Sequence, residues 1–170
     1  MAEAVGEPPR RWIDLGSGGG VPALVLLELW PSAEAVLVEA ARRRSAFLSG
    51  ALAQLGWEGR ARVVEARAEE VGRDPEYRGA VGLVTARSFA APGVTAECAA
   101  PLLRPGGRLV VSEPPAAVDR WPAAGLQALG MEAEAELEVA GFHFRLLRQA
   151  AVCPDRYPRR TGVPGRRPLF

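Results

Sequence analysis

A cluster of four glycines lies directly after a short apolar run near the start of this 170-residue chain. The stretch reads RWIDLGSGGGVPAL, from Arg11 to Leu24, and its glycines are Gly16, Gly18, Gly19 and Gly20, with Ser17 between the first two. Glycine loses more conformational freedom on folding than any other residue, so such a cluster needs a physical reason. It indicates either a flexible turn between a strand and a helix, or a backbone that lets a ligand come very close.

The residues around the cluster distinguish between kinds of nucleotide-binding loop. A Walker loop requires a lysine that reaches the phosphates, and this sequence contains no lysine. A dinucleotide fingerprint requires a third glycine at position 21, where this chain has Val21. The remaining spacing is D-x-G-x-G-x-G, formed by Asp14, Gly16, Gly18 and Gly20. It is typical of class I S-adenosylmethionine-dependent methyltransferases, whose cofactor has no pyrophosphate and lies against bare backbone.

An acidic residue follows the second apolar run, at the position where a ribose would bind. Glu39 closes the stretch AVLVE, and a carboxylate accepts hydrogen bonds from both hydroxyls of a ribose diol. An acid at the end of a strand is by itself most often a surface residue, but its spacing from the glycine loop favours ligand binding. Glu65, or Glu69 beyond it, follows the third apolar run, where we expect the adenine to lie.

Short apolar runs alternate with helix-like stretches over most of the chain. Strands are predicted at 11–15, 33–40, 61–66, 80–88 and 108–113, and helices at 21–31, 41–57, 95–107 and 118–130. Two further strands, 132–140 and 142–150, adjoin at Gly141. The pattern predicts an α/β, Rossmann-like fold with a mostly parallel sheet, helices on both faces and an antiparallel C-terminal end. Such a sheet binds ligands beyond the carboxyl ends of its strands, where the glycine cluster lies.

Length and composition predict one domain without a membrane span or a metal centre. We expect residues 1–170 to form this domain, with a basic tail at about 154–170 whose arginines are Arg156, Arg159, Arg160, Arg166 and Arg167. No apolar run approaches the ~20 residues of a membrane span, and the first residues lack a signal-peptide core, so we expect a cytoplasmic protein. Cys98, Cys153 and the single His143 show no metal-ligand spacing, so we expect no metal.

Several blocks extend this interpretation to a known family. The stretches IDLGSGGGVPAL, VEAARRRSAFL, ARAEEV, LVTARSFA, LLRPGGRLVV and RYPRRTGVPGRRPLF resemble the bacterial 16S rRNA guanine-N7 methyltransferases, the GidB/RsmG-like family, over essentially the whole chain. The first block is generic to methyltransferases, whereas the arginine-bearing blocks and the C-terminal ending are more specific. The resemblance implies methyl transfer from S-adenosylmethionine to N7 of a guanine in 16S rRNA, by a monomer that binds the rRNA or the small ribosomal subunit.

The resemblance and the loop pattern together imply roles for individual residues. The expected cofactor ligands are Asp14, Gly16, Ser17, Gly18, Gly20, Glu39, Ala40, Ala68, Glu69 and Arg87, with Ala68 and Glu69 beside the adenine. The expected RNA contacts are Arg67, Arg159 and Arg160. Arg87 is the expected catalytic residue, because it ends the fourth strand and its planar fork can orient a guanine through O6 and N7 or bind a flanking phosphate. Guanine N7 carries an available lone pair, so the transfer needs positioning and no general base.

Two departures from the family pattern leave other functions open. Only about ten residues precede the first strand, where family members carry a longer helical segment. Glu113, Pro114 and Pro115 replace the usual lysine and glycine after the fifth strand, and an acid there should repel phosphate. The alternatives are a methyltransferase for a small molecule or a protein, and a catalytically silent S-adenosylmethionine-binding module. Arg87 also has a structural alternative, an ion pair with Asp14 or Glu39.

Overall fold

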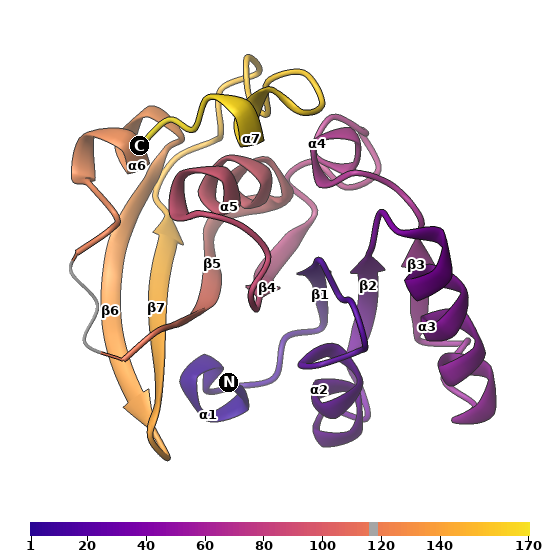
Figure 1. The fold of residues 1–170 in the computed structure, drawn as a ribbon. Helices are drawn as coiled ribbons and strands as arrows, with labels where there is room; N and C mark the ends of the chain where they lie inside the picture. Colours follow the sequence, from indigo (N-terminus) through magenta and orange to yellow (C-terminus); the bar gives the residue numbers. More distant parts are fainter. Residues whose placement is uncertain (116–118) are drawn as a thin grey trace.

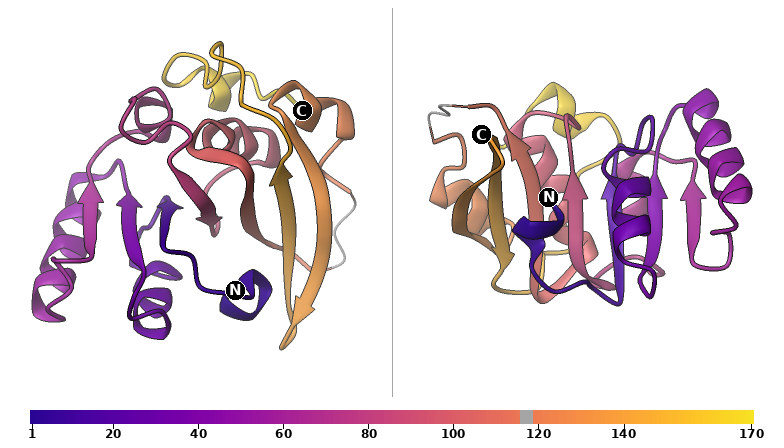
Figure 2. Two further views of the ribbon diagram at one scale, coloured as in Figure 1. Left: turned by 180° about the vertical axis from the view of Figure 1, so that it is seen from behind. Right: turned by 90° about the horizontal axis from the view of Figure 1, so that it is seen from below.

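The computed structural model describes residues 1–115 and 119–170, and in these residues a seven-stranded sheet carries helices on both faces (Figure 1 and Figure 2). The strands are β1 Arg11–Leu15, β2 Glu34–Val38, β3 Ala61–Val64, β4 Val81–Ala86, β5 Leu103–Glu113, β6 Met131–Val139 and β7 Phe142–Gln149. Their order is β3-β2-β1-β4-β5-β7-β6; β1 to β5 run parallel, and β7 runs antiparallel to β5 and β6. The order reverses between β1 and β4, where sheets of this kind open a binding crevice.

Two hydrophobic cores lie on the two sides of the sheet. The helices are α1 Ala2–Val5, α2 Ala23–Leu29, α3 Arg42–Gln54, α4 Ala68–Val71, α5 Pro92–Ala99, the 3₁₀ helix η1 Ala100–Leu102, α6 Ala123–Ala128 and α7 Val163–Arg166. Trp12 of β1 belongs to the core shared with α1, α2 and α3, whereas its neighbour Ile13 belongs to the core shared with α4, α5 and α6. Adjacent strand residues face opposite ways, so the apolar runs supply both cores at once.

The predicted fold class is confirmed by this sheet. All five strands predicted from the early apolar runs are present and parallel, and the closing pair is the antiparallel hairpin β6–β7. Ala140 and Gly141 connect the hairpin with φ angles of 51° and 78°. Positive φ at both positions is the type I′ geometry, which matches the twist of the flanking strands.

All four predicted helices have different bounds in the structure, and α2 and α3 are shorter than the predicted 21–31 and 41–57. The helix predicted over 95–107 is α5, which begins at Pro92 and continues into η1 as far as Leu102, and the following Arg-Pro-Gly-Gly belongs to β5. The strand accommodates this stretch because its pairing with β4 is irregular and Gly106 has a φ of 81°. The helix predicted over 118–130 is α6, whose N-cap residue is Pro122. Val118, the first residue of that prediction, lies outside the described residues.

Three helices of four residues each were not predicted, namely α1, α4 and α7. A single helical turn is too short to show the periodicity from which helices are predicted. In the described part of the chain, every helix is too short or too polar to cross a bilayer.

Candidate active site

The candidate site is a cavity of about 380 Å³ at the carboxyl ends of β1, β2 and β4. Its walls are the glycine loop after β1, the end of β2, the first turn of α4 and the segment that follows β4. Eight of the residues predicted to contact a cofactor line it, namely Gly16, Ser17, Gly18, Glu39, Ala40, Ala68, Glu69 and Arg87. The other two, Asp14 and Gly20, lie in β1 and in the glycine loop. Residues from four separate parts of the sequence therefore meet at one opening.

The glycine loop adopts a backbone that other residues rarely reach. Gly16, Gly18 and Gly20 have φ angles of 68°, 55° and 90°, in the left-handed region that favours glycine. A Cβ atom at Gly16 would lie 2.7 Å from the ring of Phe89, and one at Gly20 would lie 2.5 Å from Leu24. At Gly18 a Cβ would be in ordinary van der Waals contact with the carbonyl oxygen of Gly16, 3.6 Å away, so packing does not exclude a side chain there. Packing disfavours a side chain at Gly16 and Gly20, whereas Gly18 is favoured by its φ angle and lines the cavity.

Glu39 connects the glycine loop to the following helix. Its side chain is buried, and its carboxylate accepts hydrogen bonds from the N–H groups of Gly18 (3.0 Å) and Ala41 (2.8 Å) and from Arg44 Nη2 (2.9 Å). Burial by itself raises the pKa of Glu39, but the hydrogen bonds from Arg44, Ala41 and Gly18 outweigh it and lower the pKa below the usual value. The carboxylate is therefore ionised at neutral pH and can accept further donors, such as a ribose diol.

Asp14 is a buried carboxylic acid at the end of β1 with one oxygen unused. Oδ1 accepts a hydrogen bond of 2.6 Å from Thr85 Oγ1, whereas Oδ2 has no partner among the described residues. Burial raises the pKa of Asp14 to about 6, against the opposing effects of Thr85, Ser17 and the charge of Arg87. A buried acceptor without a partner is unfavourable unless a ligand supplies a donor or a positive charge. S-adenosylmethionine carries positive charge on its sulfonium and its ammonium group, so the buried carboxylate of Asp14 fits that cofactor.

A further wall of the cavity is formed by the start of α4. Ala68 and Glu69 are buried there, and Arg67 is exposed beside them at the N-cap position. Glu69 Oε1 accepts a hydrogen bond of 2.9 Å from the backbone N–H of Gly162, in the C-terminal tail. The tail therefore contacts a residue of the cavity wall, which the sequence did not predict.

Arg87 lies at the rim of the cavity, in the first position after β4. It is exposed, and together with Val21 it also lines a second, largely apolar groove of about 410 Å³. The next residue, Ser88, has a φ of 51°, which is uncommon outside glycine. Arg87 forms no ion pair with Asp14 or Glu39 in the described part of the chain; Glu39 pairs with Arg44 instead. The alternative in which Arg87 serves only as an ion-pair partner of one of these two carboxylates is therefore not observed.

Two residues of the site were missed in the sequence. Arg44 holds Glu39, and Phe89 packs against Gly16 and lines the cavity. Both follow a predicted site residue closely, Arg44 five positions after Glu39 and Phe89 two positions after Arg87. Their short distance along the sequence from those residues was the only feature that could have predicted them.

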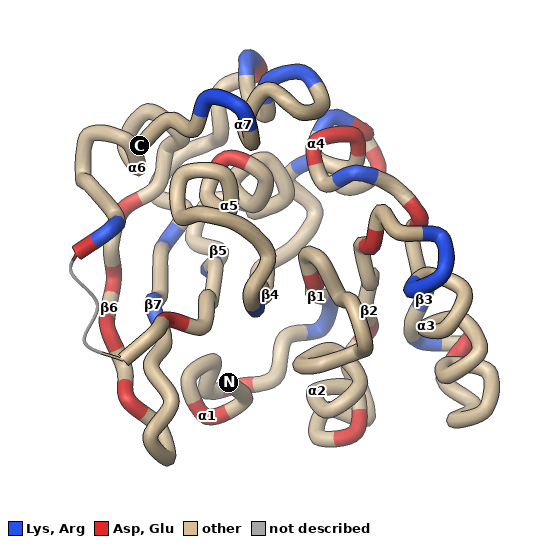
Figure 3. The backbone as a smooth tube through the Cα atoms, viewed as in Figure 1, with Lys and Arg blue, Asp and Glu red and all other residues tan. Residues whose placement is uncertain are grey.

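The tail residues expected to contact RNA differ from one another in the structure. Arg160 is exposed, but the guanidinium of Arg159 is turned inward to the buried carboxylate of Glu97 on α5, with Nη2 2.6 Å from Oε2. The guanidinium of Arg159 thus has an internal partner, and its contact with RNA stays a prediction. Figure 3 shows that arginines nevertheless gather along the tail near α7 and at the start of α3.

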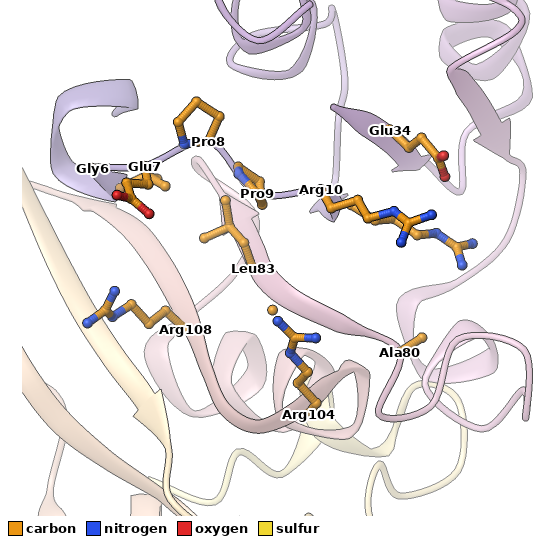
Figure 4. Close-up of a pocket in the computed structure, with 13 residues that line it drawn as sticks. Gly6, Glu7, Pro8, Pro9, Arg10, Glu34, Ala80, Leu83, Arg104 and Arg108 are labelled. Atoms are coloured by element: carbon orange, nitrogen blue, oxygen red, sulfur yellow. The ribbon is translucent and has the colours of Figure 1, made fainter. Parts of the chain in front are cut away.

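A larger cavity, of about 820 Å³, lies at the opposite end of the sheet (Figure 4). It is bordered by the amino-terminal ends of β1, β2 and β4, with Arg10, Arg104 and Arg108 as well as Glu7 and Glu34 around it. Parallel α/β sheets bind ligands at the carboxyl ends of their strands, and none of the residues predicted for the site lies here. We therefore assign the site to the smaller cavity.

The sheet and the helices on its two faces form a class I methyltransferase fold. Among solved structures, the chain is similar to the antibiotic-resistance methyltransferase Kmr, with 19% identity, a TM-score of 0.65, and 82% of this chain and 86% of that chain covered. It is also similar to the O-methyltransferase NcsB1 from neocarzinostatin biosynthesis, crystallised with S-adenosylmethionine, at 16% identity and a TM-score of 0.66, over 82% of this chain and 48% of that chain. At these identities the likeness concerns the fold alone.

Sequence comparison identifies the family. A model of the family GidB, rRNA small subunit methyltransferase G, matches residues 2–122. The ribosomal RNA small subunit methyltransferase G of Roseiflexus castenholzii is 38% identical over 97% of this chain and 73% of the relative, and that of Symbiobacterium thermophilum is 39% identical over 99% and 74%. The chain belongs to the rRNA small subunit methyltransferase G family, and it is an S-adenosylmethionine-dependent methyltransferase.

Proposed function

We propose that this protein transfers a methyl group from S-adenosylmethionine to N7 of a guanine in 16S rRNA. The observation that carries the proposal is the position of Arg87 at the rim of a cavity lined by the glycine loop and the buried carboxylate of Glu39, with the buried carboxylate of Asp14 in the adjoining strand β1. Membership of a family named for the small-subunit rRNA supports the substrate. We further propose that residues 1–170 act as one domain, as a monomer and in the cytoplasm, on free 16S rRNA or on the small ribosomal subunit.

The two carboxylates have different proposed roles in holding the cofactor. Glu39 is ionised and fixed by three hydrogen bonds, so its remaining acceptor capacity suits the ribose diol. Asp14 lies deeper and carries the unused oxygen, so it stabilises the positive charge of the bound cofactor. Ala68 and Glu69 form the wall where we place the adenine.

In this proposal the protein promotes methyl transfer by aligning guanine N7 with the methyl group of the cofactor. When bound, S-adenosylmethionine supplies an activated methyl group, and a guanine N7 that already carries a lone pair accepts it without a general base. Arg87 is exposed at the rim and donates hydrogen bonds in pairs, so it can hold the guanine edge at O6 in line with the methyl group. Arg67, which also lines the cavity, and Arg159 and Arg160, in the tail, are the proposed contacts to RNA phosphates.

A methyl-transfer assay tests this function directly. The protein is incubated with tritiated S-adenosylmethionine and with small ribosomal subunits, or their stripped 16S rRNA, from a strain that lacks this modification. We expect label in the rRNA at a single guanine, mapped by cleavage at N7-methylguanine. Label in a small-molecule pool or in ribosomal protein, with none in rRNA, would support the alternative methyltransferases. Cofactor binding without any transfer would support the silent module.

A further inference from the structure

The C-terminal segment 153–170, called here the C-terminal strap, folds back across α4 and α5. In Figure 1 it passes above these two helices and ends beside α6. The guanidinium of Arg78 donates hydrogen bonds to the carbonyl oxygens of Cys153 (3.0 Å), Pro154 (3.2 Å) and Tyr157 (2.9 Å). The far end of the strap is also packed, because a Cβ atom at Gly125 of α6 would lie 2.1 Å from the ring of Phe170. The strap is thus attached at both ends.

The middle of the strap is anchored by Arg159. Glu97 on α5 is completely buried, and it accepts hydrogen bonds from the backbone N–H of Arg159 (2.8 Å), from Nε (2.8 and 3.1 Å) and from Nη2 (2.6 Å). The same Nη2 donates to the carbonyl oxygen of Arg167, 2.7 Å away. A buried carboxylate is tolerated only when it is paired and hydrogen-bonded. Arg159 therefore satisfies Glu97 and fixes the strap at this point on α5.

Three residues further on, the strap reaches the cofactor cavity. Gly162 has a φ of 79°, and its N–H donates the 2.9 Å hydrogen bond to Glu69 Oε1. Glu69 is buried and lines the cavity next to Ala68. The position of the Glu69 carboxylate therefore depends on a backbone group that Arg159 holds in place.

We propose that Arg159 is a positioning residue for cofactor binding, which it promotes by holding Gly162 against Glu69. The inference rests on the proposed function, in that S-adenosylmethionine occupies this cavity with its adenine beside Glu69. When Arg159 is removed, the strap leaves α5 and Glu69 loses its donor, so the wall beside the adenine is no longer ordered before binding. Ordering the wall then opposes binding. By linkage, the bound cofactor must stabilise the strap by the same factor.

Arg159→Gln tests the proposal, because it keeps a polar side chain but removes the charge and the fork. We expect the dissociation constant for S-adenosylmethionine, measured by calorimetry at a temperature where circular dichroism shows a folded protein, to rise about tenfold. The rate of methyl transfer at saturating cofactor should stay within about twofold of wild type, because Arg87 and the glycine loop are unchanged. Glu97→Gln should have a similar effect. The double variant should weaken binding little further, because both substitutions break the same contact between Arg159 and Glu97.

Leu52→Ala is the matched control. Leu52 is buried on α3 and belongs neither to the strap nor to the cavity, so this variant lowers the melting temperature but should leave cofactor affinity unchanged. Hydrogen exchange on the wild-type protein needs no variant. The amides of 159–167 should exchange several-fold more slowly when S-adenosylmethionine is bound.

Three results would overturn the proposal. Arg159→Gln and Glu97→Gln could behave like Leu52→Ala, with lower melting temperatures and normal cofactor affinity, which would make the strap purely structural. Arg159→Gln could raise only the KM for rRNA, which would make Arg159 an RNA contact. Exchange in 159–167 could be insensitive to the cofactor. If the wild-type protein binds no S-adenosylmethionine at all, the proposed function itself fails.

Discussion

The backbone N–H of Gly18 and the carboxylate of Glu39, 21 residues apart in the sequence, are joined by a hydrogen bond of 3.0 Å. The glycine loop after β1 and the acid after β2 are thus parts of one structure. The N–H groups of Gly16 and Ser17 reinforce it by donating to the carbonyl oxygen of Val38, at 2.9 and 3.1 Å. The loop is therefore held in its shape before any ligand arrives.

Gly18→Val should abolish or severely weaken S-adenosylmethionine binding. The new side chain would protrude into the cavity that Gly18 lines, and valine would have to adopt a φ of 55°. Gly59→Val is the control, since Gly59 lies in an exposed turn, has open space around it and does not line the cavity. Calorimetric titration should show wild-type affinity for Gly59→Val. Normal affinity in Gly18→Val would mean that the cofactor does not lie on this loop.

Glu39→Ala should weaken cofactor binding by roughly 1.5–3 kcal/mol, the scale of hydrogen bonds to a charged group. The substitution removes the proposed ribose acceptor and also releases Gly18, Ala41 and Arg44. Arg44→Gln separates these effects, because it removes one partner of Glu39 but keeps the carboxylate. We expect calorimetry to show a smaller loss for Arg44→Gln. An equal loss in both variants would indicate that Glu39 acts only by shaping the loop.

Asp14→Asn should stabilise the protein at neutral pH while it weakens cofactor binding. The pKa of Asp14 is about 6 in the folded protein against 3.8 as the unperturbed value. Between these two values the folded state binds more protons than the unfolded state, so the free energy of unfolding decreases as the pH rises from about 4 to 6. A shift of about two units corresponds to about 3 kcal/mol at pH 7.

Urea unfolding of Asp14→Asn and wild type at pH 4, 5, 6 and 7 measures this effect. The stability difference between them should grow with pH in favour of Asp14→Asn and level off above about pH 6. In wild type, affinity for the cationic cofactor should decline as the pH falls below about 6, because Asp14 then loses its negative charge. A stability difference that is independent of pH would mean that Asp14 does not titrate in this range.

Arg87→Ala should leave the fold intact and cofactor affinity only modestly changed, while methyl transfer to rRNA falls on the order of a hundredfold or more, the size of a positioning defect. Arg87→Lys should rescue little activity, because lysine keeps the charge but loses the paired donors. Single-turnover methylation, measured beside cofactor affinity, distinguishes the possibilities. A normal rate in Arg87→Ala would exclude a role in the transfer, and joint loss of binding and transfer would assign Arg87 to the cofactor.

Arg160→Gln should reduce the salt dependence of RNA binding. If Arg160 contacts one phosphate, its loss flattens the slope of log affinity against log salt by roughly 0.7–0.9. Arg148→Gln is the control, because Arg148 is also exposed but is paired with Glu132. We expect the slope of Arg148→Gln to equal that of wild type. An unchanged slope in Arg160→Gln would remove this residue from the RNA interface.

Neighbouring residues along the chain were sufficient to predict the fold class and the centre of the site. Buried parallel strands require continuous apolar runs, so the order of strands and helices was visible in the sequence. The turn after β1 requires left-handed backbone at three positions, so glycines marked it. Glu39 could be predicted because its position at the end of β2 follows from the length of an apolar run.

The partner of each charged side chain was decided only by the tertiary structure. Arg159 and Arg160 are adjacent arginines in one basic motif, yet Arg159 reaches Glu97, 62 residues away, and Arg160 is exposed. Asp14 meets Thr85 across 71 residues, and Glu69 meets Gly162 across 93. The sequence determined which residues can carry charge, which allow a sharp backbone turn and which can be buried. The order of strands in the sheet and the return of the tail over α5 decided which of them meet, because residue types alone do not specify a distant contact.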